Sequence, residues 1–136
     1  MIDVEAEGIQ FGIHFILDGY GAAKETLTSS SDLQDLLERL PAEVGMHTIH
    51  DPVVVEVGPN NKKDPGGISG FVMVAESHIA IHTFPNRGFV SIDVYTCNDT
   101  LPTDILQQRF TEHFKLQNAD VQVIARGTKY PEHDIY

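Results

Sequence analysis

Three runs of alternating apolar residues follow one another between Gly67 and Cys97, and no other feature restricts the fold of this chain as much. The runs read SGFVMVAE, HIAIHTF and GFVSIDVYTC, and only short connections separate them. Alternation with a period of two is typical of strands that bury one face, and short connections join antiparallel neighbours. We therefore expect this region to form the centre of an antiparallel sheet.

Elements on either side extend the pattern to the order β-α-β-β-β-β-α-β. The additional predicted strands span 8–21, 52–58 and 119–127, and the predicted helices span 29–45 and 102–117. The strand at 52–58 is a short apolar run and is expected to be buried. This order predicts an α+β fold, a two-layer α/β sandwich with an antiparallel-rich sheet and two helices packed on one face.

Each predicted helix has a recognisable start and one apolar side. The first opens with cap-type serines and the second has Pro102 in its first turn. The residues expected to face the sheet are Leu33, Leu36, Leu37 and Leu40 in the first helix and Ile105, Leu106, Phe110 and Phe114 in the second.

Length and composition restrict the class of protein. The chain has 136 residues, which fits one domain, and its longest apolar runs are too short to span a bilayer. Its formal charge of −11 disfavours binding to nucleic acid or to an anionic membrane, which needs clustered Lys and Arg. A single cysteine, Cys97, cannot form an internal disulfide. We therefore expect a cytoplasmic protein with a small-molecule partner.

The alternation also sorts side chains onto two faces of the sheet. Val90, Ile92 and Val94 share one face, as do Ile79 and Ile81 on the neighbouring run, and this face should meet the helices. The opposite face collects polar side chains, namely His14, Asp18, His78, His82, Ser91, Asp93, Tyr95 and Cys97.

This polar face has three interpretations. A solvated face is common in antiparallel sheets. A metal site could use His78, His82 and Cys97, but the sequence offers no CxxC or HExxH motif and no evident further ligand, so no metal is expected. The HTIH stretch at 47–50 lies near a helix end without partners in the sequence. The third interpretation is catalysis.

Catalysis is favoured by a resemblance that covers nearly the whole chain. Residues 67–97 resemble the core of the prokaryotic S-adenosylmethionine decarboxylases, pyruvoyl-dependent enzymes of polyamine synthesis. The shared motif is ESH, three residues, HT, one residue and Pro, followed by DVYTC. FGIHFILDGYG near the N-terminus and ARG at 125–127 resemble the family's other landmarks in order and spacing.

The resemblance implies that the domain, residues 1–136, is a zymogen that cuts itself between Glu76 and Ser77. Ser77 Oγ would attack the Glu76 carbonyl, and β-elimination and hydrolysis would leave a pyruvoyl group at position 77. The products would be a β chain, 1–76, and an α chain, 77–136. Ser69 would assist this processing, and His82 would remove the Ser77 α-proton.

The same resemblance implies a carboxy-lyase whose cofactor is the pyruvoyl group, with no pyridoxal phosphate and no metal. The pyruvoyl carbonyl would form a Schiff base with S-adenosylmethionine and accept the electrons released with carbon dioxide. Cys97 would return a proton to the substrate α-carbon. The family also implies a homodimer with its active sites near the dimer interface, and a product used for spermidine.

Two substrate contacts depart from the family pattern. Asn86 stands where members usually have a ribose-binding glutamate, and Lys63, in the loop 59–67, stands where they tend to have an aromatic residue that stacks on adenine. Phe84 could still offer an aromatic surface. These departures keep open a decarboxylase of arginine or ornithine, whose cation Asp18 or Asp93 could pair. A non-catalytic regulatory paralogue is a further alternative, which the intact Ser77, His82 and Cys97 disfavour.

Overall fold

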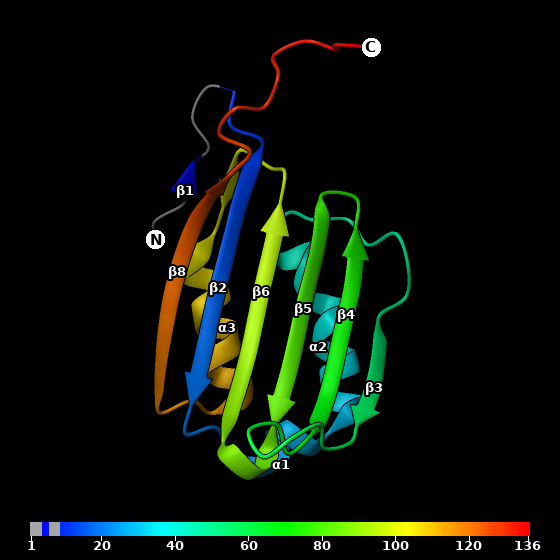
Figure 1. Ribbon diagram of the computed structural model, residues 1–136, viewed down its shortest axis with the longest axis vertical. Coiled ribbons are helices and arrows are strands. Elements are labelled where there is room, and N and C mark those ends of the chain that lie inside the picture. Colours follow the sequence, from blue (N-terminus) through cyan, green and yellow to red (C-terminus); the bar gives the residue numbers. More distant parts are fainter. Residues whose placement is uncertain (1–3, 6–8) are drawn as a thin grey trace.

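A six-stranded sheet organises the computed structural model, which describes residues 4–5 and 9–136. The strands lie in the order β3-β4-β5-β6-β2-β8, and every neighbouring pair is antiparallel (Figure 1). Their bounds are β2 (Gly12–Tyr20), β3 (Val53–Val57), β4 (Gly67–Val74), β5 (Ser77–Phe84), β6 (Phe89–Thr96) and β8 (Asn118–Arg126).

Three helices cover one face of this sheet and leave the other face open. They are α1 (Lys24–Thr28), α2 (Ser30–Glu43) and α3 (Thr103–Phe114), and in Figure 1 all three lie on the same side of the strands. The predicted α+β two-layer fold is therefore confirmed. None of the helices in the described part of the chain is long and apolar enough to cross a membrane.

The hydrophobic core fills the layer between helices and sheet, as the apolar periodicities predicted. The four leucines of α2 are buried, and so are Leu106, Phe110 and Phe114 of α3, while Ile105 is packed against the core in part. Val90, Ile92 and Val94 of β6 and Ile79 and Ile81 of β5 supply the sheet side. The cap prediction also holds, because Ser29 Oγ accepts a hydrogen bond from the Asp32 N–H at 3.2 Å.

The helix α1 differs from the prediction, which placed only two helices in the chain. Its five residues are too few to display an apolar period, yet Leu27 is fully buried. The buried Thr83 of β5 connects it to the sheet: its hydroxyl donates to the Leu27 carbonyl at 2.7 Å and accepts from Ile68 N–H at 3.0 Å. The threonine of the HTFP stretch, Thr83, is therefore explained by the two hydrogen bonds through which it joins α1 to the sheet.

Two further differences concern strands. The short strands β1 (Val4–Glu5) and β7 (Thr100–Leu101) form a separate antiparallel pair that the sequence did not predict. The prediction that 52–58 is a buried strand is wrong. Because the helices cover only one face of the sheet, Val53, Val55 and Val57 of the edge strand β3 remain 43% to 53% exposed on the open face.

We predict that Phe110→Ala lowers the free energy of unfolding by about 3–5 kcal/mol, because the substitution removes a fully buried ring that stacks on Phe15 and leaves a cavity. Chemical denaturation monitored by circular dichroism measures the change. Gln107→Ala, on the exposed side of the same helix, is the matched control and should change stability by less than about 0.5 kcal/mol. Equal effects of the two substitutions would contradict the packing described here.

Candidate active site

The predicted nucleophile Ser77 begins β5 directly after a tight turn, in an unusual backbone conformation. Residues 75–76 form the turn between β4 and β5, and Val74 pairs with Ser77 across it. Ser77 has a φ of 149°, a region that residues with a side chain rarely adopt. The peptide bond between Glu76 and Ser77 therefore lies at a strained point of the hairpin.

The Glu76 carboxylate anchors this turn to the segment that follows α2. It accepts a hydrogen bond from the His47 backbone N–H at 2.9 Å and pairs with His47 Nδ1 at 2.6 Å. Two backbone contacts continue the attachment, from Ala75 N–H to the His47 carbonyl at 2.8 Å and from Ile49 N–H to the Met73 carbonyl at 3.1 Å. The HTIH stretch at 47–50 thus has a partner that lies 29 residues away, which the sequence could not indicate.

The environment of the Glu76 side chain lowers its pKa. Partial burial alone would raise the pKa of this carboxyl, whose side chain is 13% exposed. The hydrogen bonds from the His47 ring and backbone outweigh that effect and hold the pKa of Glu76 below the ordinary glutamate value. The carboxylate is therefore kept charged at the turn.

The backbone carbonyl of Glu76 points at β6. It accepts a hydrogen bond from the Cys97 N–H at 2.9 Å, directly after the register pair Ser77 and Thr96. Cys97 itself is half-buried and free. Three of the predicted site residues, Glu76, Ser77 and Cys97, therefore gather at one end of the sheet. An N–H on this oxygen is suitable for stabilising negative charge if the carbonyl is attacked.

His82 and Ser69 form a second group, nearer the other end of the sheet. Ser69 Oγ and His82 Nδ1 are 2.8 Å apart across β4 and β5. Ser91 is opposite His82, and Asp18 is opposite Ser91, so one row crosses four strands. His82 is five residues from Ser77 on the same strand, about 16 Å at about 3.3 Å per residue, so the two do not meet within one chain.

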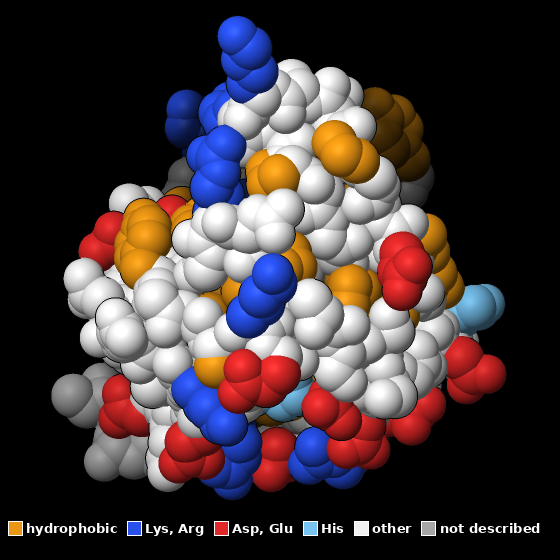
Figure 2. All heavy atoms as spheres, turned by 90° about the horizontal axis from the view of Figure 1, so that it is seen from below, with side chains coloured by type: hydrophobic (Ala, Val, Ile, Leu, Met, Phe, Trp, Pro, Cys, Tyr) orange, Lys and Arg blue, Asp and Glu red, His pale blue; other side chains and the backbone are white. Residues whose placement is uncertain are grey.

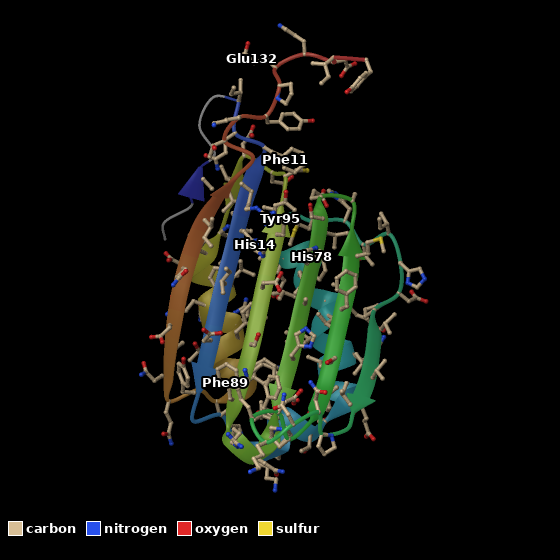
Figure 3. All side chains as sticks on the ribbon, in the orientation of Figure 1. Phe11, His14, His78, Phe89, Tyr95 and Glu132 are labelled. Atoms are coloured by element: carbon tan, nitrogen blue, oxygen red, sulfur yellow. The ribbon has the colours of Figure 1, made fainter. Side chains whose placement is uncertain are left out.

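Between these groups lies a network of hydrogen bonds on the open face. Asp93 Oδ1 is 3.1 Å from His14 Nε2 and 2.9 Å from His78 Nε2, and Tyr95 lies between the two rings in the register (Figure 3). Arg126 Nη1 donates to His14 Nδ1 at 2.7 Å, so the other ring nitrogen of His14 carries the proton that Asp93 accepts. Strand alternation predicted the shared face but not the part played by Arg126.

This network shares only His78 with the metal site considered in the sequence analysis, which used His78, His82 and Cys97. His14, His78 and Asp93 place one possible ligand atom each within 4.8 Å of one another, the sole group of this kind in the described residues. His82 and Cys97 do not belong to it. Since the Nε2 protons are engaged by Asp93, metal binding would require both rings to lose those hydrogen bonds.

The proposed substrate contacts gather beyond His82, at the end of the sheet opposite Ser77. Lys63 and Phe84 line a cavity of about 620 Å³, together with Tyr20, Phe89 and Arg87. Asn86 is exposed beside it in the short 3-10 helix η1 (Pro85–Arg87). Figure 2 looks onto this end, where Lys and Arg side chains stand beside apolar ones. Asp18 lies on β2, in the row of His82 rather than in the cavity lining.

The comparisons with known proteins agree on one family. The family model described as S-adenosylmethionine decarboxylase matches residues 13–127. The S-adenosylmethionine decarboxylase proenzyme of Archaeoglobus fulgidus is 31% identical over 117 residues, which are 85% of this chain and 97% of that protein. The proenzyme of the same name from Moorella thermoacetica is 32% identical over 121 residues, 88% of this chain and 90% of that one.

A solved structure agrees with the sequence comparisons. The crystal structure of the adenosylmethionine decarboxylase from Aquifex aeolicus superposes with a TM-score of 0.74 at 28% identity. The match covers 93% of this chain and 99% of that chain. The likeness therefore extends over nearly the whole chain.

We predict that His47→Ala raises the pKa of Glu76 toward the ordinary glutamate value, because the variant loses the ring hydrogen bond and keeps only the backbone one. NMR titration of the Glu76 carboxyl measures the change, in a Ser77→Ala background that keeps position 76 inside the chain. His50→Ala is the matched control, since its ring contacts the Asp51 carbonyl instead.

The same contact makes stability depend on pH. Because the folded pKa of Glu76 is depressed, the stabilisation is complete above the ordinary glutamate pKa and is lost as pH falls through the folded pKa. The free energy of unfolding should therefore fall less on acidification in His47→Ala than in its parent. An equal fall in both would show that the His47 contact does not control this carboxyl.

Proposed function

This chain belongs to the S-adenosylmethionine decarboxylase family, and on that premise we propose that it cuts itself between Glu76 and Ser77 and then removes carbon dioxide from S-adenosylmethionine in the cytoplasm. The observation that carries the proposal is the geometry at the β4–β5 turn. Ser77 has its strained φ there, and the Glu76 carbonyl oxygen already accepts the Cys97 N–H.

Self-cleavage follows from nucleophilic chemistry on the chain's own backbone. Ser77 Oγ attacks the Glu76 carbonyl carbon, and the Cys97 N–H stabilises the negative charge on its oxygen. The C–N bond breaks, the Ser77 nitrogen takes up the hydroxyl proton and leaves as a free amine, and an ester joins Glu76 to Ser77 Oγ. A base then takes the Ser77 α-proton, the Cβ–Oγ bond breaks, and Glu76 leaves with a new C-terminal α-carboxylate. Water hydrolyses the remaining dehydroalanine to the pyruvoyl group with release of ammonia.

Strain at Ser77 favours this reaction. Backbone conformations of this kind cost about 1–3 kcal/mol each and persist only where surrounding structure imposes them. Here the β ladder on both sides and the Glu76–His47 contact impose it. Cleavage removes the Ser77 nitrogen, and the unfavourable φ disappears with it.

The residues present fit a pyruvoyl group made at position 77. Such a group supplies the carbonyl that accepts electrons when carbon dioxide leaves the substrate. The Cys97 thiol, directly after the strand β6 that pairs with Ser77, returns a proton to the substrate α-carbon. The His47–Glu76 contact positions the new C-terminus of the β chain after the cut.

His82 and Ser69 act on the Ser77 of a second copy. A proton transfer needs atoms about 2.6–3.2 Å apart, whereas His82 lies about 16 Å along the strand from its own Ser77. The open sheet face exposes Phe71 at 39% and Met73 at 47%, beside the valines of β3, which suits an apolar interface. A two-fold homodimer through this face brings the His82 end of one copy to the Ser77 end of the other.

In that dimer the cavity with Lys63, Phe84 and neighbouring Asn86 adjoins the partner's Ser77 end. Phe84 lies two residues beyond His82 on the same face of β5 and presents an aromatic surface to the substrate. Lys63 lines this cavity and Asn86 stands beside it. Neither side chain offers the aromatic ring or the carboxylate that the family pattern has at these positions for a nucleoside, so other amines are assayed as well.

We predict that Ser77→Ala leaves the chain uncut and inactive, and that Cys97→Ala cuts normally but loses about 10²- to 10⁴-fold in turnover. Carbon dioxide release from S-adenosylmethionine, arginine, ornithine and lysine, assayed side by side, measures activity and should single out S-adenosylmethionine. Ser31→Ala, an exposed serine on α2, is the control. Wild-type turnover in Cys97→Ala would remove the thiol from the mechanism.

We also predict complementation between Ser77→Ala and His82→Ala. Each variant alone should be inactive, because every site of its homodimer lacks one group. After co-expression at equal levels, activity should return to about a quarter of the wild-type level, since about half of the dimers are mixed and each holds one complete site. Absence of rescue, with mixed dimers verified by mass spectrometry, would contradict a site shared between two copies.

A further inference from the structure

The segment 45–49, between α2 and β3, runs along the end of β4 and reaches the turn that the proposed cleavage divides. Thr48 forms an isolated antiparallel bridge with Val74, and Ala75 N–H donates to the His47 carbonyl at 2.8 Å. The pairing of β4 with β3 ends before this bridge, and β5 occupies the other edge of β4. The segment 45–49 therefore extends the β3 side of the sheet up to the turn.

The same segment is bonded to the part of the chain that carries Cys97. The side chain of Asn98 donates from Nδ2 to the Gly45 carbonyl at 3.1 Å, and its backbone N–H donates to Thr96 Oγ1 at 3.1 Å. Cys97 lies between the two, and its own N–H is bonded to the Glu76 carbonyl. The segment 45–49 thus contacts both groups that meet at the carbonyl to be attacked.

His47 is the residue of this segment that holds the Glu76 side chain. Its backbone N–H donates to Glu76 Oε1 at 2.9 Å, and its ring donates from Nδ1 to Oε2 at 2.6 Å. Two donors of one residue on the two carboxylate oxygens fix the orientation of the carboxylate as well as its position. The His47 side chain is itself 80% exposed. Its ring therefore contributes this contact rather than packing in the core.

We propose that His47 is a positioning residue for self-cleavage, which keeps the Glu76 carbonyl on the Cys97 N–H while Ser77 Oγ approaches. The inference rests on the proposed function, because it concerns the cut between Glu76 and Ser77. The hydrogen bonds of His47 are made to the Glu76 side chain and to the Ala75 backbone. His47 therefore acts through the turn and not on the reacting atoms.

The physical reason is the freedom of one peptide plane. In a turn of two residues the direction of the Glu76 carbonyl depends on a few backbone torsions. His47 fixes this residue through its side chain, and the Cys97 N–H fixes it through its carbonyl oxygen. Attack by the Ser77 hydroxyl needs the reacting atoms about 3–3.5 Å apart and aligned. Exclusion of other turn conformations raises the fraction of molecules that can react.

The test measures the rate of self-cleavage in newly made full-length chains. Samples of a cell-free translation are quenched over time, and mass spectrometry follows the appearance of fragments 1–76 and 77–136. We expect His47→Ala to cut about three- to tenfold more slowly than the wild type, because it loses a hydrogen bond to a charged group at an exposed position. His50→Ala, whose ring contacts the Asp51 carbonyl, is the matched control and should cut at the wild-type rate.

A conservative variant separates positioning from a general loss of structure. Asn carries an N–H donor on its δ nitrogen, near the place of the imidazole Nδ1, so His47→Asn should cut within about twofold of the wild-type rate. Circular dichroism of the uncut Ser77→Ala counterparts verifies that the slow variants are folded.

Removal of the carboxylate shows which group His47 acts on. Glu76→Ala should slow the cut at least as much as His47→Ala does, so the test does not depend on one variant. In the Glu76→Ala background, His47→Ala should slow the cut by less than about a further twofold, because no carboxylate remains to be held.

Three outcomes would overturn the inference. They are a wild-type cutting rate in His47→Ala, an equally slow cut in His47→Asn, and an undiminished effect of His47→Ala when Glu76 is already Ala. A wild-type chain that stays uncut overturns the proposed function and this inference with it. That failure is distinguishable from the other three, because it is seen in the mass of the wild-type protein before any variant is compared.

Discussion

The turn between β4 and β5 is the constraint on which the site depends. Two residues reverse the chain, and the ladder to β6 continues up to Ser77 and Thr96, so Ser77 has no freedom to relax its φ of 149°. The Glu76 carboxylate is held from one side by His47, and the Glu76 carbonyl from the other by the Cys97 N–H. A peptide bond held at both ends in a strained geometry is well prepared for attack by the neighbouring hydroxyl.

The sheet arranges the remaining groups in two sets rather than one. Glu76, Ser77 and Cys97 occupy one end, His82 and Ser69 lie toward the other, and the His14–Asp93–His78 network separates them on the open face. Because helices cover only the opposite face, the side that carries both sets is free to meet a second copy. The same exposure that leaves the valines of β3 half in solvent thus fits the sharing of a site between two chains.

Alternation in the sequence was sufficient to predict the central strands and the two faces of their side chains, because burial of one face requires a period of two. Val90, Ile92 and Val94 are buried, and Asp93 and Tyr95 lie opposite, as expected. Alternation does not give the register between neighbouring strands or the exact residue at which a strand begins. The predicted strand began at His78, and the structure extends it to Ser77, so that Ser77 and His82 share β5 at a separation of about 16 Å, too far apart to react within one chain.

A local sequence pattern could not predict contacts between segments that lie far apart in the chain. The His47–Glu76 pair joins residues 29 apart, and the meeting of Tyr130 with Phe11 joins the two ends of the chain. The apolar run of β3 does not show that one face of the sheet stays open, so its three exposed valines were taken for core residues.

The proposed self-cleavage consumes the hydroxyl of residue 77 in making the reactive group of the enzyme. Denaturing mass spectrometry of the freshly purified wild-type protein tests this claim most directly. We expect two fragments, 1–76 and 77–136, with the second fragment resistant to Edman sequencing because a pyruvoyl group replaces its N-terminal amine. A single intact chain of 15.1 kDa in a sample that releases carbon dioxide from S-adenosylmethionine would contradict it.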